Sequence, residues 1–236
     1  MLLDTSTDIA NRLISELPRK VSKPLLLSCE TVQLEFGAIL AERGDQIKHI
    51  YFPLSSFISL VTPLKGHPAL EMGIIGNEGI YGASVVLGVT TAPMRAVVQG
   101  SGTALRMETR QFQRLNRDSP ALLRIMNRYV YVTMAQLART AACNHFHEIE
   151  PRLARWLLMT HDRAHADHFH LTHEFLADML GVRRSGITVA AGALQAKKLI
   201  GYTRGEISIL DRAGLEAASC ECYEVVNEDY AQQFSG

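Results

Sequence analysis

Two adjacent arginines, Arg183 and Arg184, stand in a stretch of the sequence that contains no opposing charge. From 179 to 205 there is no aspartate or glutamate, although the segment from 145 to the end holds 13 acidic and 9 basic residues. A guanidinium can hold O6 and N7 of guanine through two hydrogen bonds, and clustered cations bind phosphates. This local positive charge indicates contact with a polyanion, while a solvated basic face remains the alternative.

The segment from 171 to 194 has the packing pattern of two helices joined by a tight turn. Thr172 can cap the first helix, Ala177 is small where the two helices would cross, and Gly181 permits a positive φ in the turn. The pattern predicts a helix-turn-helix whose second helix begins beside the arginine pair. In complexes of this motif with DNA, that end of the second helix meets the base edges.

The predicted DNA contacts lie on this motif and its flank. Hydroxyl groups early in the second helix can reach bases or phosphates, and His173 can reach a phosphate. We expect Gly186 to allow the backbone to approach DNA closely. The predicted contact residues are Thr172, His173, Arg183, Arg184, Ser185, Thr188, Lys197, Lys198 and Arg204.

Short apolar runs at 199–202 and 207–210 flank Arg204 and Gly205. This pattern predicts a β-hairpin with Arg204 at its tip, followed by one closing helix over 211–223. The hairpin would form the wing of a winged helix.

A long helix is predicted to precede this unit. Ser119 and Pro120 form a helix start, and nothing breaks a helix before about Asn144. Apolar and threonine residues recur there at spacings of four and three, which favours pairing with a second helix. The predicted dimer-interface residues are Met126, Val130, Thr133, Leu137 and Thr140. Packing of this face on its own domain is the alternative.

The distribution of glycine in the N-terminal part is typical of a β domain with many turns. Ten of the 17 glycines lie between Gly37 and Gly102, and none lies between Thr103 and Leu180. A short amphipathic helix is predicted over the ten residues before Pro18, with Ile9, Leu13, Ile14 and Leu17 on its apolar side. The predicted strands are 32–36, 47–52, 57–62, 70–75, 95–99 and 104–107. Such short strands indicate an antiparallel sandwich, barrel or jelly roll.

Other reactive side chains give weaker patterns. Seven of the nine histidines lie between His145 and His173, yet no cysteine or glutamate completes a familiar zinc set near them. Cys220 and Cys222 are too close for the usual redox pair, so we expect them to be inert. No catalytic triad, phosphate loop or dinucleotide fingerprint is present. We therefore predict no enzyme, no metal site and no cofactor.

The composition is that of an ordinary globular protein. The chain has 236 residues, 47% hydrophobic and 20% charged, and a formal net charge of zero. No apolar run approaches the roughly 18 residues of a membrane helix. The start of the chain has no secretory pattern, and four scattered cysteines fit a reducing compartment. These features predict a cytoplasmic protein without a membrane partner.

The whole arrangement resembles the Crp/Fnr (catabolite-activator) family of bacterial transcription regulators. The DNA-binding stretch LTHEFLADMLGVRRSGITVAAGALQAKKLI carries the resemblance best, and EIEPRLARWLL resembles the helix that precedes it. The resemblance implies an α+β chain: a β-roll sensor domain at 1–118, a dimerisation helix at 119–147 and a winged helix-turn-helix at 148–236. It also implies a homodimer on near-palindromic double-stranded DNA, contact with RNA polymerase, and an effector that it does not identify.

Carried over by position, Arg184 matches the family's base-reading arginine. Ser185 replaces the acidic residue that usually follows, and Val189 replaces a second base-reading arginine. We therefore expect a changed half-site.

The sensor cassette GNEGIYGASVVLGVTTAPMRAVV also departs from the family. Members that bind cyclic AMP have Gly-Glu near one end and Arg-Ser or Arg-Thr near the other. Here Glu78 is offset by one residue, Arg95 is present, and Ala96 replaces the hydroxyl residue. Glu78 and Arg95 are candidates for an effector pocket, with a structural salt bridge as the alternative role of Arg95. We predict no response to cyclic AMP. Only Cys29 lies in this half, which argues against the family's iron–sulfur cluster.

Two other functional classes remain open. One is a β-roll protein that binds a small molecule or a metal and whose helical tail contacts other proteins. The other is a constitutive regulator whose sensor has lost its ligand.

Overall fold

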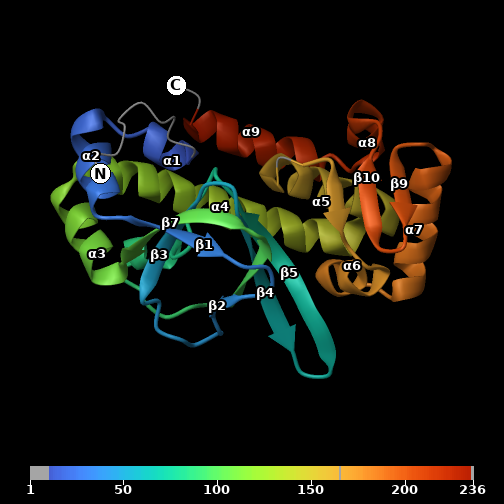
Figure 1. The fold of residues 1–236 in the computed structure, drawn as a ribbon, viewed down its shortest axis with the longest axis horizontal. Coiled ribbons are helices and arrows are strands. Elements are labelled where there is room, and N and C mark those ends of the chain that lie inside the picture. Colours follow the sequence, from blue (N-terminus) through green and yellow to red (C-terminus); the bar gives the residue numbers. More distant parts are fainter. Residues whose placement is uncertain (1–10, 165, 235–236) are drawn as a thin grey trace.

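The computed structural model describes residues 11–164 and 166–234. Figure 1 shows an elongated molecule with the antiparallel sheets of the N-terminal half at one end and a small helical unit at the other. The helix α4 (Pro120–Phe146) runs along the molecule between them. No helix in the described ranges combines the length and the apolar character needed to cross a membrane.

The N-terminal half contains two antiparallel sheets that enclose one apolar core. One sheet has the order β1-β7-β3 and the other the order β2-β6-β4-β5. All six predicted strands are present, and β2 was missed because it has only three residues. The bounds are β1 Glu30–Leu34, β2 Ile39–Ala41, β3 His49–Pro53, β4 Phe57–Leu64, β5 His67–Ile75, β6 Arg95–Gly100 and β7 Gly102–Glu108.

Short helices close this core. They are α1 (Arg12–Ser15), α2 (Arg19–Leu27), the 3-10 helix η1 (Ala83–Leu87) and α3 (Thr109–Asp118). On α1, the fully buried Leu13 and Ile14 confirm the apolar side of the predicted N-terminal helix. Ile9, which we placed on the same side, lies outside the described residues.

The start of α4 is the one that the sequence predicts. The Ser119 hydroxyl accepts a hydrogen bond from the Leu122 backbone N–H at 3.2 Å, and Pro120 occupies the first turn. At 1.5 Å per residue, 27 residues give a helix about 40 Å long. Its buried side, with Leu122, Met126 and Tyr129, packs on the N-terminal core.

The C-terminal unit is a winged helix-turn-helix. Its sheet has the order β8-β10-β9, in which the predicted hairpin pairs antiparallel and gains a third strand. The bounds are α5 Ile149–Ala164, β8 His168–His170, α6 His173–Leu180, α7 Arg184–Ala196, β9 Ile200–Thr203, β10 Glu206–Ile209 and α8 Arg212–Ala218. Together these elements confirm the α+β architecture predicted from the sequence.

The prediction of one closing helix was wrong, because the chain bends between α8 and a further helix, α9 (Cys222–Phe234). This helix runs back along α4 toward the N-terminal half (Figure 1). The Tyr230 hydroxyl donates to the Glu78 backbone oxygen at 3.0 Å, and Phe234 joins the N-terminal core. Helix α9 therefore packs on the N-terminal half as well as on the C-terminal unit.

Buried polar contacts also join the two ends of the molecule. The Trp156 indole N–H donates to Glu71 Oε1 at 2.9 Å, and Arg163 Nη2 lies 2.7 Å from Glu78 Oε1. Both carboxylates come from the N-terminal half, and both partners come from α5. The winged helix is therefore held against the β5 strand and the loop that follows it.

Candidate DNA interface

The turn between α6 and α7 has the geometry that its sequence predicts. Thr172 caps α6 by accepting a hydrogen bond from the Phe175 N–H at 3.1 Å. Gly181 ends α6 with φ +64°, and Ala177 is buried. A Cβ on Gly181 would lie 2.7 Å from Leu70 Cδ1, so this turn also packs against β5. Glycine is therefore favoured there by its positive φ, and any larger residue would also require Leu70 to move.

Two faces of α7 differ sharply in exposure. Its buried face packs through Ile187, Ala190, Ala191 and Leu194. Its exposed face carries only small, polar or basic side chains apart from Val189, which is 73% exposed. The exposed residues of this face are Arg184, Ser185, Thr188, Val189, Gly192, Gln195 and Ala196. A face this shallow and free of carboxylates can approach an anionic groove closely.

The N-terminal end of α7 concentrates positive charge. Arg183 is the N-cap residue and makes no side-chain cap, so the first N–H groups of the helix face outward. The Arg184 side chain is 71% exposed, and its Nε lies 3.9 Å from Glu174, which makes only a weak surface pair. Both guanidinium groups are thus available to an external partner.

His173 contacts other side chains of the C-terminal unit. Its Nδ1 lies 3.0 Å from Thr188 Oγ1, and its ring stacks on Tyr202 with 4.3 Å between centroids. Burial, together with the nearby Arg184 charge, lowers the pKa of His173, and its Nε2 is buried. This half-buried ring contacts Thr188 and links α6, α7 and the wing, and its contact with a phosphate stays a prediction.

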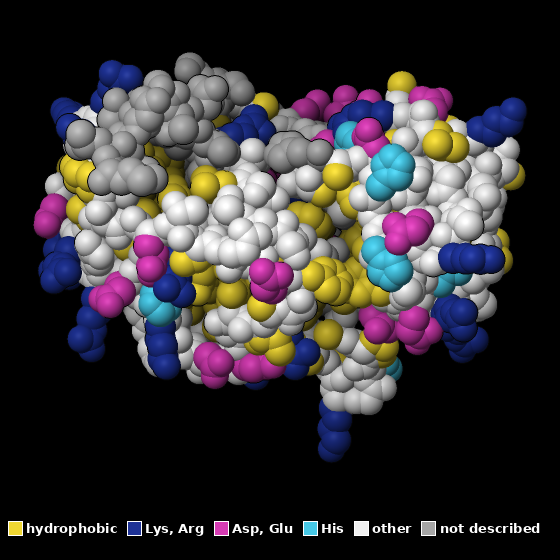
Figure 2. Space-filling model, in the orientation of Figure 1, with side chains coloured by type: hydrophobic (Ala, Val, Ile, Leu, Met, Phe, Trp, Pro, Cys, Tyr) yellow, Lys and Arg dark blue, Asp and Glu magenta, His cyan; other side chains and the backbone are white. Residues whose placement is uncertain are grey.

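The remaining basic residues fall into two groups. Lys197 Nζ lies 2.5 Å from Glu150 Oε1, so its charge is partly neutralised within the chain. Lys198 and Arg204 are exposed, with positive φ values of 58° and 52°, and the described residues provide no ion pair to either. Arg204 occupies the tip of the β9–β10 hairpin as predicted. Figure 2 shows Lys and Arg side chains projecting at the end of the molecule that carries this unit.

Gly186 does not face the DNA side, so the role predicted for it was wrong. A Cβ there would lie 2.6 Å from Ile149 Cδ1, which shows that Gly186 faces α5. Gly192 is the exposed glycine of α7, and a Cβ added to it would meet no atom within 4 Å.

Comparison with known proteins identifies this unit. A family model described as a Crp-like helix-turn-helix domain matches residues 151–218. Residues 151–218 are a Crp-like helix-turn-helix domain. No curated protein sequence matches the chain.

Solved structures extend the likeness to most of the chain. A regulator of the Crp/Fnr family from Eubacterium rectale has a TM-score of 0.68 at 17% identity, covering 87% of this chain and 96% of that one. FixK2 from Bradyrhizobium japonicum has a TM-score of 0.69 at 11% identity, covering 81% and 98%. CLP of Xanthomonas campestris, described as responsive to c-di-GMP, has a TM-score of 0.66 at 15% identity, covering 81% and 99%. At these identities the likeness establishes the Crp/Fnr fold.

In the N-terminal half of this Crp/Fnr fold, the two predicted effector residues do not meet. Arg95 Nε lies 2.9 Å from Glu42, so Arg95 has the structural salt bridge proposed as its alternative role. The Glu78 carboxylate is occupied by Arg163 of α5, with both side chains largely buried. A cleft of about 560 Å³ is lined by Glu78, Tyr129 and Arg163 but not by Arg95. Of the two candidates, only Glu78 therefore lines this cleft, and its role toward an effector stays a prediction.

The predicted dimer seam on α4 is only partly exposed. Met126 is fully buried in the N-terminal core, and Thr140 is buried under Arg155, whose Nη2 lies 3.3 Å from its hydroxyl. These two side chains cannot face a second copy of the chain. Val130, Thr133 and Leu137 are half-buried. The exposed apolar residues of the neighbouring stripe include Leu123, Tyr131 and Met134.

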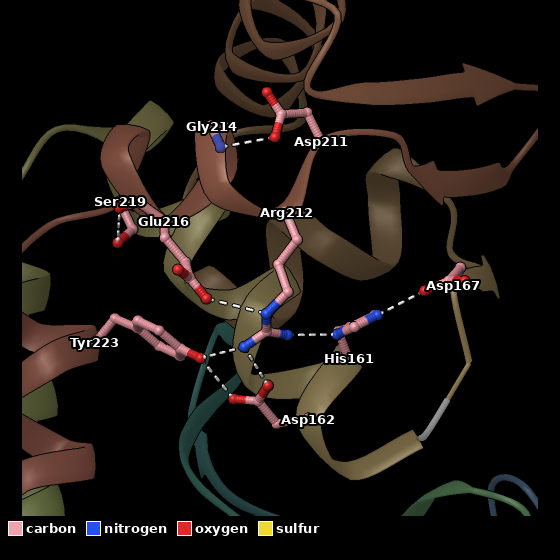
Figure 3. Close-up of polar contacts among 9 residues, drawn as sticks. All are labelled: His161, Asp162, Asp167, Asp211, Arg212, Gly214, Glu216, Ser219 and Tyr223. Carbon is pink, nitrogen blue, oxygen red and sulfur yellow. Dashed lines mark hydrogen bonds and ion pairs between the residues drawn. The ribbon is translucent and has the colours of Figure 1, made fainter.

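His161 of α5 and His170 of β8 are engaged in ion pairs and hydrogen bonds within the chain. Arg212 of α8 contacts Asp162 at 2.8 Å and His161 Nδ1 at 2.5 Å, while His161 Nε2 lies 2.7 Å from Asp167 (Figure 3). The Tyr223 hydroxyl donates to Asp162 at 2.8 Å and completes this network. His165, four residues after His161, lies outside the described residues. The network ties α5, α8 and α9 together.

Sequence reasoning missed Glu71. It is 8% exposed and accepts hydrogen bonds from Ser59 Oγ at 2.6 Å and from Trp156. Burial raises the pKa of this carboxyl to about 7, against the lowering effects of those two hydrogen bonds and of Arg155 and Arg163. A lone glutamate inside the strand pattern of β5 could have flagged it, but its partner lies 85 residues away.

Proposed function

We propose that this protein is a sequence-specific DNA-binding transcription regulator that acts as a homodimer. The observation that carries the proposal is the exposed face of α7, which presents hydroxyl groups and two available guanidinium groups at the helix N-terminus. This is the end of a recognition helix that reads base edges in the major groove.

The test of this role is selection of binding sites from random duplexes, followed by titration of the selected site. Arg184→Ala removes the predicted base contact, which is worth about 1–3 kcal/mol, or roughly tenfold to a hundredfold in Kd. The matched control is Arg110→Ala, which removes the same charge from an exposed position on α3. If the two variants lose equal affinity for the selected site, Arg184 contributes only its charge and reads no base.

Dimerisation is proposed through a corrected seam on α4. Leu123, Val130, Met134, Leu137 and Ala141 recur at spacings of seven, four, three and four, and all are exposed or half-buried in the single chain. Two such helices would pair as a short coiled coil and place two α7 helices on successive major grooves, roughly 34 Å apart.

Light scattering of the intact chain tests the seam. Met134→Glu puts a charge on a side chain that is 64% exposed in the single chain, and we expect it to produce monomers. Leu64→Glu is the control, because Leu64 is also exposed but lies at the end of β4. A dimer that survives Met134→Glu contradicts the seam.

We also propose that cyclic AMP is not the effector. Arg95 is paired with Glu42, Glu78 with Arg163, and Ala96 is buried and has no hydroxyl to offer a phosphate. Calorimetric titration with cyclic AMP should give no binding heat, whereas micromolar binding contradicts the proposal. Contact with RNA polymerase stays a prediction from the family resemblance.

A further inference from the structure

Four side chains with metal-ligating atoms meet at the junction between α4 and the C-terminal unit. They are Cys143 in the last turn of α4, His147 just after it, Cys220 between α8 and α9, and Cys222 at the start of α9. Each contributes one ligand atom, and these four atoms lie within 4.8 Å of one another. The sequence did not bring them together because Cys222 is 75 residues from His147.

Two distances between these atoms are close to the edges of a single tetrahedral metal centre. Cys143 Sγ and Cys220 Sγ are 3.6 Å apart, and Cys222 Sγ is 3.6 Å from His147 Nδ1. Zinc bonds of about 2.3 Å to sulfur and 2.0–2.1 Å to nitrogen give tetrahedral edges of about 3.8 Å for S···S and 3.6 Å for S···N. The sulfurs are too far apart for a disulfide, which requires about 2.05 Å.

The surroundings of the cluster suit a bound cation with thiolate ligands. Cys143, Cys220 and Cys222 are 0%, 6% and 1% exposed. The other nitrogen of His147, Nε2, lies 3.1 Å from Glu221, and a zinc-bound imidazole usually donates its free N–H to a carboxylate in this way. Arg155 Nη1 lies 3.7 Å from Cys143 Sγ and can offset the single negative charge left when a divalent cation binds three thiolates.

We propose that Cys143, His147, Cys220 and Cys222 bind one Zn²⁺ ion. Three thiolates and one imidazole form a closed tetrahedral set of the structural type, with no position left for substrate. On binding, the three thiols lose their protons to the solvent while the imidazole stays neutral. Hard cations that prefer oxygen, such as Mg²⁺ and Ca²⁺, do not suit these ligands.

The proposed ion would fasten the point where α4 meets the winged helix. Cys143 and His147 belong to the end of α4, while Cys220 and Cys222 belong to the α8–α9 connection. Arg152, in the first turn of α5, donates to Asn144 at 2.8 Å and to the Leu180 carbonyl, next to the helix-turn-helix turn. Zinc at this junction would therefore fix the orientation of the winged helix, and with it that of α7, relative to α4.

The test is the zinc content of the untagged full chain, purified in reductant without chelator and measured by mass spectrometry. We expect about one zinc per chain in the wild type and a loss of most of it in Cys143→Ser and Cys222→Ser. Cys29→Ser is the matched control, because Cys29 lies in the N-terminal half outside the cluster, and it should keep the metal. His147→Cys supplies a fourth thiolate and should also keep it, provided that circular dichroism shows a folded chain.

Replacement of zinc by Co²⁺ gives a second readout that does not depend on DNA binding. Four ligands of this type should give the intense visible absorption of tetrahedral cobalt with sulfur-to-metal charge transfer. A reduced, folded wild-type chain that holds no zinc and does not take up Co²⁺ overturns the proposal. So does zinc that stays bound in both cysteine variants. Neither outcome bears on whether α7 binds DNA.

Discussion

The buried carboxyl of Glu71 makes the stability of this fold depend on pH in a way that one substitution should remove. Glu71 lies between the two halves of the molecule, hydrogen-bonded to Ser59 of β4 and Trp156 of α5. Burial raises its pKa from 4.5 to about 7. The folded state therefore holds a proton that the unfolded chain releases between these two values.

The sign and size of the effect follow from this difference. Below pH 4.5 the carboxyl is protonated in both states, so its full contribution to stability is present there. As the pH rises to about 7, the unfolded chain ionises first, and the free energy of unfolding falls. At about 1.4 kcal/mol per pKa unit, the loss attributable to Glu71 reaches about 3 kcal/mol. Glu71→Gln keeps an acceptor for Trp156 and removes the titration.

Urea unfolding of both proteins at pH 5, 6, 7 and 8 measures this effect. Trp156 is the single tryptophan of the chain and contacts Glu71, so its fluorescence reports on this interface directly. We expect the stability of Glu71→Gln relative to the wild type to rise by about 2–3 kcal/mol between pH 5 and pH 8, because part of the loss in the wild type has already occurred at pH 5. Other titrating groups cancel in this difference. Glu35→Gln, at an exposed position, is the control and should show no such trend. A constant difference for Glu71→Gln across this range refutes the reasoning.

Three further outcomes follow from the geometry. Gly192→Ala should stabilise the chain by about 1 kcal/mol because a Cβ at this position meets open space. Gly186→Ala should stabilise it less, or destabilise it, because the side chain of Ile149 must move. Equal unfolding midpoints for the two variants contradict this expectation. Glu221→Gln should weaken zinc binding by about 10–100-fold in a competition with a chromogenic chelator, since His147 loses its carboxylate partner; unchanged affinity removes Glu221 from the site. The affinity for the selected DNA should fall steeply with salt concentration, and a flat titration excludes binding dominated by phosphate contacts.

Local sequence patterns predicted the elements well where the signal was local. Thr172, Gly181 and the arginine pair specify the helix-turn-helix because a cap, a positive φ and a helix start depend on neighbouring residues only. The wing was predicted for the same reason, with Arg204 and Gly205 in its turn.

The errors concern side chains whose roles depend on distant parts of the chain. Met126 fits a heptad seam, but its side chain is buried in the N-terminal core because α4 packs on the sheets. Glu78 and Arg95 match the two ends of a ligand cassette, yet each finds a different charged partner. The cysteine cluster is assembled by the path of α9, which the sequence did not reveal.

The contacts between the two halves suggest how a signal could reach α7. Glu71 and Glu78 present largely buried carboxyl groups to Trp156 and Arg163 of α5, so the docked arrangement shields both groups from water. Separation of the winged helix from β5 would expose both carboxylates to water. Because exposure returns the Glu71 pKa toward 4.5, separation would release a proton between that value and about pH 7. Acidification therefore favours the docked arrangement. Any effector or DNA site that favours separation must overcome this linkage through a higher affinity for the undocked state.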